Sequence, residues 1–220
     1  MSLVTFIMYS ANIPPLLGGI LALIYFRKFD PKLYSFKLFL LFNAAIQSIQ
    51  FVLSVLKHHN LFLLHIDVPI EFILLTHFYY SVLKQYLDKK IFFTLVVLFV
   101  TFSIANSIFI QNIDSFNSYA LITESVIIII LSIFTFIVLL DPRSGMNNTP
   151  IGKTVRLINS GIFVNLSTTL LIYYFSNFLL NHFTKKIVNY IWIYNDLASV
   201  VMYACFIIAI FKYVKPGKSR

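Results

Sequence analysis

Long apolar runs separated by short polar links dominate the pattern of this 220-residue chain. A helix needs about 20 mostly apolar residues to cross the hydrocarbon core of a bilayer. Seven runs are long enough, so the pattern predicts an all-α fold, one polytopic domain with seven transmembrane helices. The predicted helices cover residues 4–26, 33–56, 61–83, 91–110, 120–140, 157–180 and 190–213.

Composition supports a membrane location. The chain is 59% hydrophobic and only 11% charged, with a mean hydropathy of +0.86. Soluble domains carry roughly 25% charged residues, so a soluble globular fold is excluded and the lipid bilayer is the first predicted partner. The amino terminus has no basic segment ahead of its apolar run, and we expect it to be a retained helix rather than a signal peptide.

The basic residues are unevenly distributed along the chain. Fourteen of the 17 lysines and arginines flank the first, third and fifth links or lie in the carboxyl-terminal tail. The remaining three are Lys57, Lys185 and Lys186. Positively charged links favour the cytoplasmic side, so we expect an outside amino terminus, a cytoplasmic carboxyl terminus and a plasma-membrane location. The net charge of +9 therefore reflects topology, and no nucleic-acid partner is predicted.

The third apolar run contains two acids four residues apart, Asp67 and Glu71, with Pro69 between them. In a continuous helix both carboxylates would lie on one face, where a shared proton, a cation or a neighbouring donor must relieve their repulsion. Alternatively, Pro69 could occupy the first turn of a helix that Asp67 caps. The first reading places the acids in a cavity, and the second places them at a helix start.

Other predicted helices also carry polar faces. A stripe on the second, Asn43 to Ser54, could form interhelical hydrogen bonds or line a cavity. Trp192, Asp196 and Tyr203 share one face of the last. In the first helix, Pro14 and Pro15 predict a bend near mid-membrane.

With this orientation, eight polar residues fall in the outer halves of their helices, where they could converge. These are Asn12, Gln47, Gln50, Asp67, Glu71, Glu124, Asn195 and Asp196. Trp192 and Tyr203 would add aromatic faces, and Glu124 could instead cap its helix. No lysine or arginine lies at this depth, so a shared cavity would be acidic and suited to a small cationic or hydroxyl-rich solute. Separate packing of each polar group against its nearest helix is the alternative.

Three functions fit these features. A carrier of a small polar or cationic solute, with coupling protons on Glu71 or Asp196, needs only the helices themselves. A sensor would signal through a cytoplasmic protein that docks on the basic links, and a structural subunit of a membrane complex is the third. No catalytic constellation, cofactor or metal site is predicted, because no suitable ligand or acid–base pair shares a face.

The predicted topology is similar to two membrane families. Rhodopsins have seven helices and an outside amino terminus, but the last helix here, Tyr190 to Phe211, has no lysine to bind retinal. Sugar and vitamin carriers share the topology, and Asp30-Pro31-Lys32 after the first helix is echoed by Asp141-Pro142-Arg143 after the fifth. The Pro-Gln signature of those carriers is missing, so no family is assigned.

Overall fold

The computed structural model describes residues 10–214, and every regular element in that part of the chain is helical. A π-helical turn, Asn106–Ile110, extends α5, and short 3-10 turns occur in several of the links. The longer helices are α2 (Ile13–Ile24), α3 (Tyr34–Val55), α4 (Leu64–Leu83), α5 (Lys89–Ala105), α6 (Ser118–Leu140), α7 (Pro150–His182) and α8 (Lys185–Val214).

Within residues 10–214, six helical segments are long and apolar enough to cross a membrane, so the chain is a multi-pass helical membrane protein. They correspond to α3 through α8. The predicted first span, 4–26, lies partly outside the described residues, and its described portion is the 12-residue apolar helix α2.

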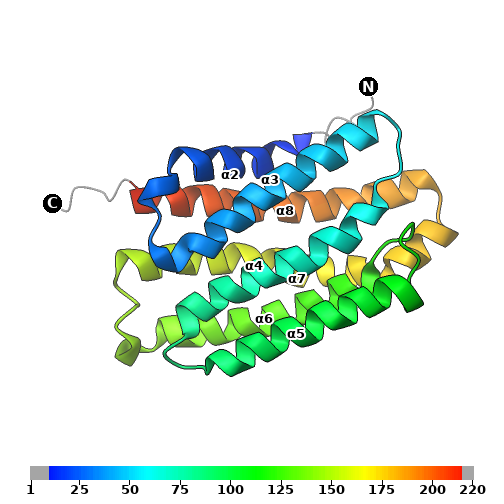
Figure 1. The fold of residues 1–220 in the computed structure, drawn as a ribbon. Coiled ribbons are helices and arrows are strands. Elements are labelled where there is room, and N and C mark those ends of the chain that lie inside the picture. Colours follow the sequence, from blue (N-terminus) through cyan, green and yellow to red (C-terminus); the bar gives the residue numbers. More distant parts are fainter. Residues whose placement is uncertain (1–9, 215–220) are drawn as a thin grey trace.

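Six of the helices close into a ring. In the order α2, α3, α4, α6, α7, α8, each helix packs against the next, and α8 packs against α2. Helix α5 lies outside the ring against α4, and less extensively against α6. Helix α5 runs along the edge of the bundle on the far side from α2 (Figure 1).

The two ends of the bundle differ in their links. The α2–α3, α4–α5 and α6–α7 links lie at the left in Figure 1 together with the described end of α8, and we call this the basic end. The α3–α4, α5–α6 and α7–α8 links lie at the opposite end. The clustered basic links inferred from the sequence therefore share one end of the fold.

Two predicted helix starts are wrong, because both helices begin in polar sequence ahead of their most apolar parts. Helix α7 begins at Pro150 instead of 157, where Thr149 Oγ1 accepts a hydrogen bond from Gly152 N at 3.0 Å. Residues 150–156, which lie between two of the predicted spans, are thus helical. Helix α8 begins at Lys185, five residues earlier than predicted.

Pro69 and the pair Pro14 and Pro15 occupy different kinds of position in their helices. Pro69 lies inside α4, which begins at Leu64 after a 3-10 turn, so the reading with a helix start at Pro69 is wrong. Pro14 and Pro15 fall in the first turn of α2, and the bend predicted for a helix over 4–26 depends on a part of that span that lies outside the described residues. The amides of a first turn have no helical acceptor, so the missing proline N–H groups cost little there.

A buried hydrogen-bond chain fixes α4 against α6 and α7. The Tyr79 hydroxyl donates to Asn159 Oδ1 at 2.8 Å, and Asn159 Nδ2 donates to the Ser132 carbonyl at 3.0 Å. Tyr79 and Asn159 are fully buried, so these bonds satisfy polar groups that water cannot reach. They join α4, α7 and α6, and so set the position of the acids that α4 carries.

Gly19 permits the close approach of α2 and α3. A Cβ atom at this position would lie 2.4 Å from the Ala44 Cβ, closer than two carbon atoms can pack. We therefore expect Gly19→Ala to destabilise the fold by about 1–3 kcal/mol through overpacking. Thermal unfolding in detergent measures the effect, and Ala45→Leu, at an exposed neighbouring position on α3, is the control. Equal midpoints for the two variants would contradict the close approach.

Candidate functional site

A cavity of about 290 Å³ occupies the interior of the helix ring. Its wall is built from α2, α3, α4, α7 and α8, with Leu121 of α6 and Phe116 of the α5–α6 link. Nine of the ten predicted site residues lie on this wall. They are Asn12, Gln47, Gln50, Asp67, Glu71, Trp192, Asn195, Asp196 and Tyr203.

A second chamber, of about 390 Å³, adjoins the first. The chambers share seven wall residues, including Gln50, Phe116, Trp192 and Asp196. The second chamber reaches Asn60 in the α3–α4 link and Leu180 near the end of α7. We call the two the inner and outer chambers, because this route leads from the inner one to the end of the bundle opposite the basic end.

Three carboxylates line the inner chamber. Asp67 and Glu71 stand one turn apart on the same face of α4, as a continuous helix requires. Asp67 is 8% exposed, whereas Glu71 is half-buried because the chamber itself leaves part of its surface accessible. Asp196 comes from α8 and borders both chambers. Acids from two helices thus lie around one recess.

Glu124 is the predicted site residue that the wall does not include. It is 3% exposed on α6, behind the chamber, and lies close enough to Asp67 and Glu71 for electrostatic interaction. Its position in the second turn of α6 also rules out capping, since Asn117 precedes that helix. Glu124 therefore lies near the α4 acids, but its side chain does not line the inner chamber.

The amide stripe on α3 faces the chambers. Asn43, Gln47 and Gln50 line the inner chamber, and Ser54 lines the outer one. The Asn43 side chain donates to the Phe39 carbonyl of its own helix at 3.2 Å. Of the two readings of this stripe, the geometry therefore favours the cavity over bonds that bridge helices.

Phe116 is a wall residue that sequence reasoning missed. Its ring centroid lies 5.2 Å from that of Trp192 and 6.2 Å from that of Tyr173, and Phe116 and Trp192 border both chambers. The three rings therefore form an aromatic neck between the chambers. Phe116 sits in a link, where no helical periodicity could indicate its direction, whereas Tyr173 belongs to the polar face of α7.

Buried amides hold the link that carries Phe116. Asn106 Nδ2 donates to Gln111 Oε1 at 3.0 Å and to Asn117 Oδ1 at 2.8 Å. Gln111 Nε2 in turn donates to the Phe116 carbonyl at 3.3 Å, and Asn177 Nδ2 of α7 donates to the same carbonyl at 3.2 Å. The backbone at Phe116 is thus anchored from two directions.

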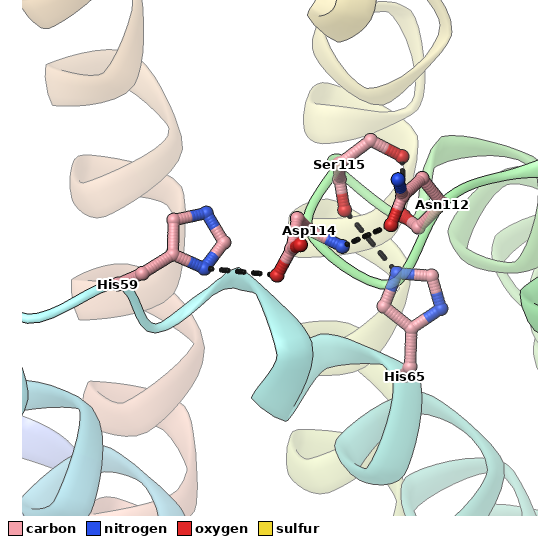
Figure 2. Close-up of polar contacts among 5 residues, drawn as sticks. All are labelled: His59, His65, Asn112, Asp114 and Ser115. Carbon is pink, nitrogen blue, oxygen red and sulfur yellow. Dashed lines mark hydrogen bonds and ion pairs between the residues drawn. The ribbon is translucent and has the colours of Figure 1, made fainter.

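Histidines attach the same link to α4 and to the α3–α4 link. His65, 8% exposed, lies 3.2 Å through Nε2 from the Ser115 carbonyl, and His59 pairs with Asp114 at 3.7 Å on the surface (Figure 2). His65 Nδ1 also lies 2.7 Å from Ser107 Oγ. The link therefore forms a fixed cover over the neck.

The wall combines acids, amides and aromatic rings, and it contains no lysine or arginine. Such a surface can bind a positive charge, accept hydrogen bonds and cover an apolar group. Among residues 10–214, no three histidine, cysteine or acidic side chains gather in a way that could hold a metal ion. Comparisons of the chain with protein-family models, curated proteins and solved structures give no match.

Proposed function

We propose that this protein is a carrier of a small polar or cationic solute, which enters the inner chamber through the outer one. In this proposal the chain crosses the plasma membrane seven times, with its amino terminus outside and its basic end in the cytoplasm. The distribution of basic residues supports that orientation. The path from the outer chamber then starts at the external face.

One observation carries the proposal: acids from α4 and α8 line a single recess that has no basic residue on its wall. Charged groups within a membrane are costly and usually serve a binding or ion pathway. The inner chamber, at about 290 Å³, lies near the small end of ligand pockets, which favours a small solute. Carboxylates on opposing helices also suit a carrier, since their separation can change as the helices move.

Glu71 and Asp196 offer a way to couple the solute to protons. A carboxylate that releases its proton gains affinity for a cation, so proton and solute would compete for the same group. Because Asp196 borders both chambers, it could exchange protons with the outer chamber. The carrier would then be driven by a proton gradient.

A sensor is the second candidate, and the shared basic end supports it. Three basic links and the described end of α8 gather there, and they would form a docking surface for a cytoplasmic protein. A ligand in the cavity would change the helix packing and so the links. A structural role in a membrane complex is the third candidate and requires no solute.

Uptake by the purified protein in liposomes separates these functions. We expect accumulation of a small radiolabelled amine such as ethanolamine, and we expect Asp196→Asn to reduce its initial rate at least about tenfold, or 1.4 kcal/mol. Asp88→Asn, an equivalent change on the exposed α4–α5 link at the basic end, keeps an oxygen for the Lys90 amide and should leave the rate unchanged. No uptake of cations or polyols by the native protein would contradict the carrier, and a co-purifying cytoplasmic protein would then favour the sensor.

A further inference from the structure

We propose that the inner chamber selects cations that donate hydrogen bonds, namely primary and secondary ammonium groups attached to an apolar body, over quaternary ammonium ions of equal charge. This inference deepens the proposed function and rests on it, because it concerns the solute class of the same cavity.

The first argument is that two buried acceptor atoms beside the chamber lack hydrogen-bond donors. Asp67 Oδ1 and Asn195 Oδ1 are buried, and neither has a hydrogen-bond partner among residues 10–214. Both residues line the inner chamber, Asp67 from α4 and Asn195 from α8. A buried acceptor without a donor is unfavourable, and rotation about the last side-chain bond can turn either oxygen of Asp67 toward the chamber. Rotation of the Asn195 amide would likewise turn its oxygen toward the chamber, so a ligand that brings N–H groups would satisfy both acceptors.

The protein itself supplies no charged donor to the chamber. Its wall contains no lysine, arginine or histidine, and its amides come from α3, α7, α8 and Asn12, which precedes α2. Water could donate hydrogen bonds, but it carries no charge to offset the carboxylates. An ammonium group with free N–H bonds provides charge and donors together, and its charge-assisted bonds are stronger than neutral ones. A trimethylammonium group provides the charge alone.

The second argument concerns the other end of the ligand. Asp67 and Glu71 border only the inner chamber, whereas Phe116 and Trp192 stand at the neck between the chambers. A cation held by the α4 acids would therefore place its remaining atoms beside these rings. Aromatic faces bind apolar groups and also attract a nearby positive charge. The arrangement thus fits an amine whose apolar part points toward the outer chamber.

Phenethylamine and its N-methyl, N,N-dimethyl and N,N,N-trimethyl derivatives test the proposal, because all four carry one positive charge on the same body. We expect the affinity, measured by thermal shift and by calorimetry in detergent, to fall at least about tenfold, or 1.4 kcal/mol, from the primary amine to the trimethyl ion. The largest losses of affinity should occur from the N-methyl to the N,N-dimethyl and then to the trimethyl compound. These steps remove the last two N–H bonds, and the chamber has two acceptors that need donors.

A variant separates hydrogen bonding from the size of the methyl groups. Asn195→Leu removes one of the two acceptors at similar volume, and it should reduce the preference for the primary amine. Asn148→Leu, on the exposed α6–α7 link, should leave the preference unchanged. If the same tenfold preference persisted in Asn195→Leu, size alone would explain it and the proposal would fail.

Three further outcomes distinguish this inference from the carrier function. Equal binding of the primary amine and the trimethyl ion, with uptake of both in liposomes, would overturn the inference and leave the carrier intact. Selective binding of the primary amine without uptake would support the inference and contradict the carrier. If none of the four bound, the inference would be overturned, and uptake of other solutes would decide the carrier separately.

Discussion

Glu71→Gln is expected to reduce the initial rate of solute uptake roughly 30-fold or more while the protein still folds and inserts. Glutamine has nearly the shape of glutamate, so the packing of α4 should survive, but the chamber loses a negative charge. Truncation of one partner of a buried charge pair typically costs about 2–5 kcal/mol. The lower value corresponds to a roughly 30-fold loss of affinity for a cationic solute, and we expect the uptake rate to fall by at least the same factor. Uptake by proteoliposomes and the thermal midpoint in detergent are the two measurements.

Glu124→Gln is the matched control for this change. Glu124 lies near Glu71 but behind the wall of the chamber, so a solute would not touch it. We expect Glu124→Gln to affect uptake less than Glu71→Gln. The opposite ranking would mean that the wall acids do not bind the solute, and it would move the site toward α6.

Helical periodicity made most of the candidate wall predictable. Asp67 and Glu71 are four residues apart, so a continuous α4 had to place them together, and Trp192, Asp196 and Tyr203 recur at helical spacing on α8. The distribution of basic residues fixed which ends of these helices share a side. Position along each helix and helical face together were enough to bring nine residues of four different segments toward one recess.

Rotation of helices relative to one another and the course of links could not be predicted in the same way. Glu124 is the only strongly polar residue near its level of α6, so no stripe indicated which way its side chain would turn. Phe116 lies in a link whose path depends on amides from α5 and α7. The start of α7 was missed because Thr149 and Pro150 set it, although hydropathy there is low. A capping residue therefore set the start of this helix in a segment where hydropathy gives no indication of one.

Asn106→Leu is expected to destabilise the protein by about 1–3 kcal/mol and, in addition, to weaken solute binding. Asn106 is fully buried, and its amide donates to both Gln111 and Asn117. Leucine has a similar volume but leaves the Asn117 acceptor without that donor, while Gln111 Oε1 keeps the Tyr119 amide at 3.1 Å. A lower thermal midpoint and faster hydrogen exchange across residues 111–117 would report the loss.

The reason to expect a binding defect lies in the cover over the neck. Gln111 anchors the Phe116 carbonyl, so a looser Gln111 should let the Phe116 ring leave Trp192. Thr101→Leu introduces the same side chain on the exposed face of α5 and should change neither stability nor affinity. A loss of stability with unchanged affinity would show that the α5–α6 link does not contribute to solute binding. Glu71→Gln should reduce uptake and leave stability unchanged, whereas Asn106→Leu should reduce stability and solute binding together. The two variants would therefore separate residues that bind the solute from residues that stabilise the wall of the cavity.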